Sequence, residues 1–261
     1  MTHRPGEVAE MLCSAYSEKV GTPMGRLFVL AVLAGAYVGF GGYFYLVVSS
    51  DAPRFVGSGL GGIASGVAFS LALILIVLGG AELFTGNGLQ VLGCLSGRVG
   101  FGAVLRNWGI IYVGNLAGAL ILVALVFGSG VYASNGGLVA ERAVALASYK
   151  VQLGFWEALL RGVLCNWLVC LAVWLAATAE DTAGKILACV FPVSAFVASG
   201  FEHSIANMFL IPLGVLVGGA GSAPGLDLAG ILSNLVPVTL GNIVGGGLFV
   251  AASYWYVYIR K

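Results

Sequence analysis

Residues 199–207 of the chain read SGFEHSIAN, and residues 81–87 read AELFTGN. Each segment sets a carboxylate beside an aromatic ring and small polar groups in the middle of a long apolar run. A charged side chain at membrane depth costs roughly 2.5–3.5 kcal/mol even on a lenient insertion scale. Two such clusters, at matching places in the two halves of a membrane chain, indicate a path for something polar.

The composition predicts a polytopic α-helical membrane protein embedded in a lipid bilayer. Of 261 residues, 59% are hydrophobic and only 9% are charged, which is too few charges for the surface of a soluble domain. The 41 glycines agree, because small residues let transmembrane helices approach closely. The long apolar runs lack the alternation of a transmembrane β-barrel. A net charge of +1 leaves no basic patch for nucleic acid.

Six apolar runs are long enough to cross a bilayer, since a span needs about 20 residues. They lie near residues 27–48, 60–95, 107–128, 156–178, 186–217 and 229–258. The second and fifth runs are too long for one straight span, and each contains one polar cluster. We therefore expect broken helices there, with irregular backbone facing protein or a water-filled cavity.

The two halves of the chain also match outside these clusters. YVGNLAGAL at residues 112–120 in the third run is similar to TLGNIVGGGL at residues 239–248 in the sixth. Three spans per repeat is an odd number, so the second copy is inverted in the membrane. The predicted fold is thus all-α, with six transmembrane helices as two inverted three-helix repeats. Interrupted segments at corresponding places point to the binding site of a transport fold.

We divide the chain into a cytoplasmic amphipathic helix at residues 1–25 and a channel domain at residues 26–261. Pro5 can open the first helix, and an apolar face follows at Val8, Met11, Leu12 and Ala15. This helix either rests on the bilayer surface or acts as a mobile plug under the pore.

The positive charges predict the orientation, because the cytoplasmic side carries more of them. With six spans, one side holds Arg4, Lys19, Arg26, Arg98, Arg106, Lys185, Arg260 and Lys261. The other side holds Arg54, Arg142 and Lys150, with Arg161 near the start of the fourth span. We therefore expect a multi-pass protein of the cytoplasmic (inner) membrane, with both termini in the cytoplasm. The connection at residues 131–155 is the longest external segment, and Lys150 in it is by default a solvated charge.

His203 is the only histidine outside the amino-terminal tail. A neutral imidazole can donate a hydrogen bond to a small anion, and a protonated one can attract it or give it a proton. Inside a broken transmembrane helix we favour a pore role over a buried structural histidine. Glu82 and Glu202 would repel an anion, so we expect them to accept hydrogen bonds from backbone N–H groups freed at the breaks. Thr85 and Asn87 offer further polar groups in the first break.

Apolar side chains flank these polar groups and could form constrictions, although packing is the simpler interpretation. They are Phe69, Leu73, Leu83, Phe84 and Phe196. The sequence contains no hydrolytic triad, phosphate-binding loop or metal-ligand set. We therefore expect no enzyme activity, catalytic residue, metal or cofactor.

Four segments resemble the signature segments of the formate/nitrite transporter family: ELFTG at 82–86, CNWLVCLA at 165–172, ASGFEHSIANM at 198–208 and PVTLGN at 237–242. The resemblance runs from about residue 5 to the end. It implies an aquaporin-like fold of six helices per protomer and a homopentamer with one pore in each subunit. It also implies passage of small monovalent anions, namely formate, nitrite or hydrosulfide.

The same resemblance implies roles for individual residues. His203 matches the family's single central histidine, and Lys150 and Asn166 match a lysine and an asparagine near it on the external side. The matches to the pore loop in the broken second helix are Leu83, Phe84 and Thr85. Phe69 and Leu73 match a slit between the cytoplasmic side and the centre, and Phe196 matches a second constriction.

The resemblance favours formate narrowly, with nitrite or hydrosulfide as alternatives. An anion drawn by Lys150 or by half-helix ends would lose water between the constrictions and exchange hydrogen bonds at His203. In one version it takes a proton there and crosses as the neutral acid, which avoids placing an ion in an apolar slit. Passive flow and proton coupling both stay open.

Two hypotheses that assign the chain to other functional classes remain. A neutral-solute channel of the aquaporin kind is disfavoured, because the paired Asn-Pro-Ala loops of such channels are missing. A structural subunit of a membrane enzyme complex would need ligands for haem or quinone, and one central histidine is too few for a two-histidine haem.

Overall fold

The computed structural model describes residues 3–260, and every regular element in that range is a helix. Five helical stretches are long and apolar enough to cross a membrane: α2 (Met24–Ser49), α3 (Ala52–Phe69) continued by α4 (Leu71–Gly79), α6 (Phe101–Gly128), α8 (Phe155–Thr178), and α11 (Leu228–Gly246) continued by η4 (Gly247–Ala252) and α12 (Ser253–Tyr258). Two shorter apolar helices, α9 (Thr182–Ala198) and α10 (Ser204–Gly218), follow each other across residues 199–203. The all-α membrane class predicted from composition is confirmed.

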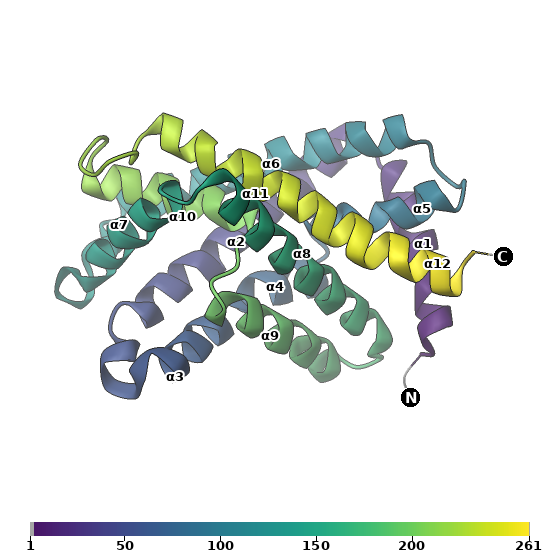
Figure 1. Ribbon diagram of the computed structural model, residues 1–261, viewed down its shortest axis with the longest axis horizontal. Coiled ribbons are helices and arrows are strands. Elements are labelled where there is room, and N and C mark those ends of the chain that lie inside the picture. Colours follow the sequence, from purple (N-terminus) through teal and green to yellow (C-terminus); the bar gives the residue numbers. More distant parts are fainter. Residues whose placement is uncertain (1–2, 261) are drawn as a thin grey trace.

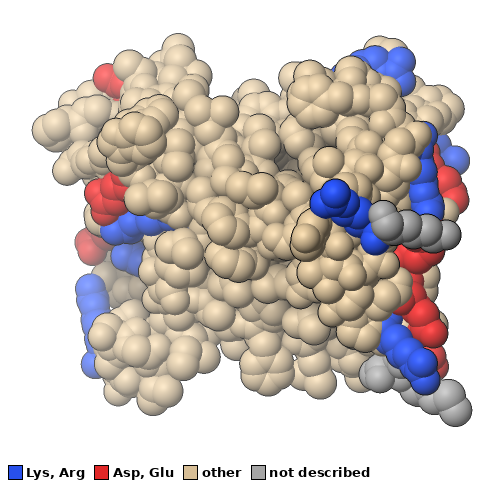
Figure 2. Space-filling view, turned by 45° about the vertical axis from the view of Figure 1, so that its right-hand side comes forward, with Lys and Arg blue, Asp and Glu red and all other residues tan. Residues whose placement is uncertain are grey.

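The remaining elements are shorter. They are α1 (Pro5–Val20), η1 (Gly86–Gln90), α5 (Val91–Leu95), η2 (Val131–Ala133), η3 (Asn135–Gly137) and α7 (Leu138–Val151). Figure 1 shows α1 and α12 near each other, with both described ends of the chain at the same end of the molecule. Figure 2 shows Lys, Arg, Asp and Glu gathered towards two opposite sides, with a wide uncharged band between them. That band suits the hydrocarbon core of a bilayer.

Both polar clusters lie between helices. α4 ends at Gly79. The next residue, Gly80, has a left-handed φ of 76°, which favours glycine, and residues 81–85 follow without regular helix before η1. α9 ends before Gly200, which also has a left-handed φ of 70°, and α10 begins after His203. These two segments meet in the interior, where Thr85 contacts His203.

Two asparagines from the matching motifs of α6 and α11 bind these two segments. Asn115 accepts from the Phe84 N–H at 2.9 Å and donates to the carbonyls of Ala31 and Glu82. Asn242 accepts from the Ser204 N–H at 2.9 Å and donates to the carbonyls of Gly162 and Glu202. Backbone groups that a continuous helix would pair internally are thus satisfied by side chains.

Residues 131–155, which we expect to be the longest external connection, contain the helix α7. α7 is short and carries Glu141, Arg142 and Lys150, which hid it from a search for apolar spans. Its buried residues Val139, Ala143 and Ala147 recur every four positions, and the helix packs against α10.

The amino-terminal helix α1 packs on protein, where we had expected a bilayer surface or a mobile plug. Its buried face includes Val8, Leu12 and Tyr16, which cluster with Leu92 and Trp174 among others. Met11 and Ala15, assigned to the apolar face from the sequence, are exposed. The burial follows an i, i+4 stripe that continues to Val20.

Candidate functional site

His203 and Thr85 form the polar centre of the molecule. The Thr85 hydroxyl lies 2.9 Å from Nε2 of His203, and both side chains are buried. The other ring nitrogen, Nδ1, accepts the backbone N–H of Ala206 at 3.1 Å and so caps α10. Because a backbone N–H can only donate, Nδ1 carries no proton in this geometry. The neutral ring then carries its proton on Nε2, and this N–H donates a hydrogen bond to the Thr85 hydroxyl.

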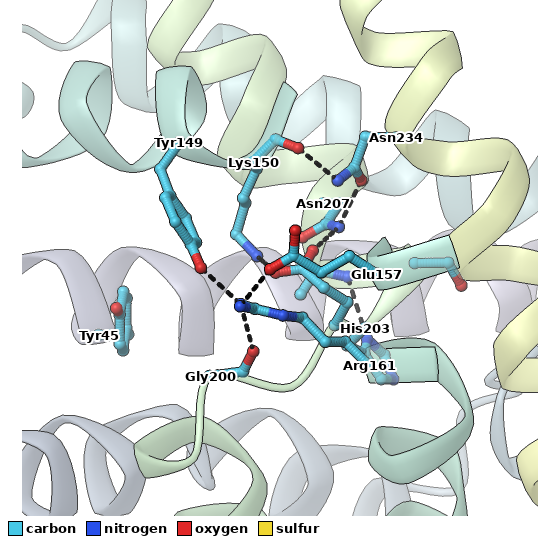
Figure 3. Close-up of polar contacts among 12 residues, drawn as sticks. Tyr45, Tyr149, Lys150, Glu157, Arg161, Gly200, His203, Asn207 and Asn234 are labelled. Carbon is cyan, nitrogen blue, oxygen red and sulfur yellow. Dashed lines mark hydrogen bonds and ion pairs between the residues drawn. The ribbon is translucent and has the colours of Figure 1, made fainter. Parts of the chain in front are cut away.

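Glu202 precedes His203 in the chain and belongs to a network of buried side chains. Figure 3 labels three other members of this network, Lys150, Asn207 and Asn234. The Glu202 carboxylate accepts from Nζ of Lys150 at 2.7 Å and from Nδ2 of Asn207 at 2.6 Å. Asn234 accepts from Asn207 at 2.7 Å and donates to the Lys150 carbonyl at 2.8 Å. Lys150 is therefore a buried, paired cation, which corrects the expectation of a solvated charge in a loop.

Glu82 has a closely similar set of partners at the other polar cluster. It contacts Nζ of Lys19 at 3.0 Å and accepts from Nδ2 of Asn87 at 2.9 Å. Asn107 donates to the Lys19 carbonyl at 3.3 Å and accepts from Gln90 at 2.7 Å. The expectation that both glutamates accept hydrogen bonds from backbone N–H groups was wrong, because their carboxylates bind lysine and asparagine side chains. The freed backbone N–H groups of Phe84 and Ser204 go to Asn115 and Asn242 instead.

Three hollows join these polar groups across the molecule. The Lys150 hollow, of about 80 Å³, is lined by Lys150, Glu202 and His203 among others. It shares His203, Phe69 and Phe196 with a central slit of about 20 Å³, which has room for about one water molecule. The slit shares Leu73, Ile76 and Leu83 with the Lys19 hollow of about 310 Å³, which Glu82 and Asn87 also line.

Two apolar pairs stand at the ends of the slit. Phe69 and Phe196 pack edge to face with ring centroids 5.9 Å apart on the side of Lys150. Leu73 and Leu83 line both the slit and the Lys19 hollow. We had grouped Phe69 with Leu73. The structure pairs Phe69 with Phe196, because α3 and α9 pack against each other there.

Three of the expected pore residues line none of the three hollows, namely Thr85, which contacts His203, Phe84 and Asn166. Phe84 packs on Trp108 and Tyr112 of α6, at 6.0 and 4.9 Å between ring centroids, and lines none of the three hollows. Asn166 is buried and donates to the Thr85 carbonyl at 3.1 Å and the Asn242 carbonyl at 2.6 Å. Asn166 therefore holds the residue that contacts His203.

Lys19 is the main site residue that sequence reasoning missed. We had counted it only as a positive charge of the amino-terminal tail, and its partner Glu82 is far away in the chain. The available signal was its place at the end of an amphipathic helix, the place that Lys150 has in α7.

An all-helical, apolar molecule whose hollows share lining residues through its centre suits the class of membrane channels and transporters. The family model described as formate/nitrite transporter matches residues 6–256. The chain therefore belongs to the formate/nitrite transporter family, whose members are channels and transporters and not enzymes, and the resemblance stated from its signature segments is confirmed.

Individual relatives are similar to this chain along nearly its whole length. The chain is 42% identical over 273 residues to a "Probable formate transporter" of Methanothermobacter thermautotrophicus, covering 98% of this chain and 97% of the other. It is 40% identical over 250 residues to "Formate channel FocA" of Escherichia coli (strain K12), covering 90% and 87%. A solved structure titled "Pentameric formate channel with formate bound" superposes with a TM-score of 0.82 at 38% identity, covering 91% and 98%.

Proposed function

We propose that the chain is a channel for small monovalent anions, with formate as its first substrate and nitrite or hydrosulfide as alternatives. The observation that supports this most is the row of three hollows, which runs from Lys150 through His203 to Lys19 and shares lining residues at each junction. Relatives named as formate channels favour formate over the other two anions.

An anion entering either end would meet a lysine that is already bound to a glutamate. Glu202 occupies Lys150, and Glu82 occupies Lys19. The anion therefore competes with a carboxylate for each ammonium, which keeps its binding weak enough for release. Between the two lysines it passes the apolar slit, where a small or neutral species crosses most readily.

The capping geometry favours a hydrogen-bonding role for His203. Nε2–H donates to Thr85, so the Thr85 hydroxyl keeps its own proton for one further hydrogen bond. A cationic ring would set Nδ1–H against the Ala206 N–H and break the cap of α10. Proton transfer by His203 would thus require this local contact to open, and we place any proton uptake in the wet hollows on either side.

We further propose that six membrane spans form two inverted repeats in an aquaporin-like arrangement, with the second and fifth interrupted at residues 80–85 and 199–203. The paired networks support this. Lys19, Glu82, Asn87 and Asn107 share most of the contacts of Lys150, Glu202, Asn207 and Asn234 in the other half. The exception is that Asn107 accepts from Gln90, whereas Asn234 accepts from Asn207. Each repeat would then include an amphipathic helix, α1 or α7, before its spans.

The assembly we propose is a homopentamer in the cytoplasmic membrane, with both termini inside the cell. Large apolar side chains on the outside of the protomer, such as Phe55, Trp156 and Phe191, would meet lipid or a neighbouring copy. Leu12 and Tyr16 of α1 line the Lys19 hollow, so the segment 1–25 would form part of the inner mouth.

Flux into proteoliposomes tests the proposal. Formate should enter faster through wild-type protein than nitrite or hydrosulfide, and chloride or glycerol should enter little. A preference for glycerol over every anion would support the aquaporin-like alternative and contradict the anion channel.

A further inference from the structure

A fourth hollow, of about 370 Å³, lies next to the Lys150 hollow and is bounded by α2, α3, α7 and α9. It contains Arg142 of α7, so we call it the Arg142 hollow. The two hollows share Tyr45, Leu146, Tyr149, Val197 and Gly200 in their linings. Anything that reaches Lys150 from this end of the molecule therefore has the Arg142 hollow beside its route.

Arg142 and Lys150 are the cations that line these two hollows. Lys150 is neutralised by Glu202 at 2.7 Å, and Arg161 at the rim is neutralised by Glu157 at 2.6 Å. Arg142 instead donates from Nε to the Ser49 hydroxyl at 3.1 Å and from Nη2 to the Tyr45 hydroxyl at 2.8 Å. Within residues 3–260, no carboxylate forms an ion pair with it. Its positive charge is thus held in place by neutral groups.

Two tyrosine hydroxyls face the same space. Tyr45 accepts from Arg142, and Tyr149 accepts from Nη1 of Arg161 at 2.6 Å (Figure 3). A hydroxyl that accepts a bond from a cation still has its own proton to donate, and the accepted bond strengthens that donor. Both tyrosines line both hollows.

We infer that the Arg142 hollow is an anion-binding site that captures planar two-oxygen anions before they reach Lys150. The guanidinium supplies an uncompensated charge and N–H groups left over from its bonds to Ser49 and Tyr45, and the two tyrosines supply O–H donors. The planar N–H groups of a guanidinium can donate two parallel hydrogen bonds, which match the two oxygens of formate or nitrite. Hydrosulfide has a single sulfur and cannot accept such a pair of bonds in the same geometry. The inference rests on the proposed anion channel and assigns substrate selection to this mouth of it.

The first test is formate flux in proteoliposomes at low ionic strength for wild type, Arg142→Gln and Arg142→Lys. Arg142→Gln should raise the formate concentration for half-maximal flux by about tenfold while maximal flux stays near wild type, because one charged hydrogen-bonding group is lost. Arg142→Lys should raise that concentration for formate but leave hydrosulfide flux unchanged. Tyr45→Phe removes only a hydroxyl and should shift formate several-fold in the same direction. Arg54→Gln is the control, since Arg54 is exposed and lines neither hollow.

The second test reads binding without flux, by saturation-transfer NMR of the formate proton with the purified protein in detergent. Arg142→Gln and Tyr45→Phe should each weaken the formate titration, and Arg54→Gln should not. If wild type binds formate through Arg142 but passes none in liposomes, the channel proposal fails and the site stands. If Arg142→Gln and Tyr45→Phe bind formate with the wild-type affinity, the proposal of an anion site in the Arg142 hollow is wrong. If Arg142→Gln does not fold, the result for Tyr45→Phe alone tests the proposal.

Discussion

His203 uses its two ring nitrogens for two separate tasks. Nδ1 caps α10 by accepting from Ala206, and Nε2–H holds the Thr85 hydroxyl. A helix cap contributes about 1 kcal/mol, and a buried donor left without a partner costs about 1–3 kcal/mol. The ring is therefore fixed in one orientation and one neutral tautomer at the narrowest part of the path.

We predict that His203→Asn keeps the pore open, because asparagine also caps helices and is a small polar group. Formate flux should stay within about tenfold of wild type, since only one or two hydrogen bonds change. The number of protons that accompany each anion should not change. Simultaneous records of formate entry and internal pH in liposomes give both quantities.

His203→Leu serves as the contrast, because leucine can neither cap α10 nor hold Thr85. This variant should yield less folded protein and little flux. If His203→Asn moves formate while internal pH stays constant, and wild type acidifies the lumen, then His203 relays protons and the hydrogen-bonding role is wrong.

The buried pair of Lys150 and Glu202 gives a second prediction. Lys150→Met leaves the Glu202 carboxylate buried beside an apolar side chain, which should destabilise the protein by about 3–5 kcal/mol. The double variant Lys150→Met with Glu202→Gln should recover a large part of that loss. Unfolding in detergent followed by circular dichroism measures both. A double variant no more stable than Lys150→Met would show that the unpaired carboxylate is not the cause of the loss.

The sequence predicted individual polar residues of the site better than their pairing. Thr85 and His203, which contact each other, were both candidates, because both stand in the clusters at the apparent breaks. The bond between Lys150 and Glu202 was not expected, because it joins α7 to a segment far along the chain. Short-range patterns report what a residue is, whereas its partner depends on tertiary packing.

At the scale of elements, close crossings hold the helix pairs α2–α6 and α8–α11 together. A Cβ at Gly118 of α6 would overlap the carbonyl oxygen of Val32, and a Cβ at Gly241 of α11 would overlap that of Leu159. In a membrane, such small-residue contacts replace much of the hydrophobic driving force for helix association.

We therefore expect Gly118→Ala to separate α2 from α6 and lower the thermal unfolding midpoint sharply. Gly109→Ala lies on the same helix where nothing lies within 4 Å of the added Cβ, so it should be neutral or slightly stabilising. Differential scanning fluorimetry of both variants in one detergent compares them. A drop of the same size in both would mean that the close crossing is not the cause.

Long apolar elements were predictable, and short mixed ones were not. The span runs overlap the observed helices α2, α6, α8 and α11, because a continuous apolar stretch has no other stable form in a bilayer. α7 escaped because its charged residues face hollows and its buried face consists of small side chains. The length of α3 was also missed, since its first turns are rich in glycine and lie before the apolar run.

At the scale of the whole molecule, both described ends of the chain lie at the same end of the molecule (Figure 1). The richer positive charge of that end predicts that it faces the cytoplasm. A reporter that is active only in the cytoplasm, fused to either terminus, should therefore give signal at both. A silent fusion at the carboxyl terminus alone would mean an odd number of spans and a wrong membrane placement.

Among the described residues that line the opposite mouth there is no arginine, and Lys185 is the second cation there. Arg142 stands eight residues before Lys150, and the residue eight before Lys19 is Met11. The two ends of the conduit are thus near copies in their lysine, glutamate and asparagine groups. They differ in the second cation, which is the guanidinium of Arg142 at one end and the ammonium of Lys185 at the other. Under equal and opposite voltages, the current should be slightly unequal in dilute anion and become equal once both mouths are saturated. The protein would behave as a weak rectifier whose asymmetry depends on concentration.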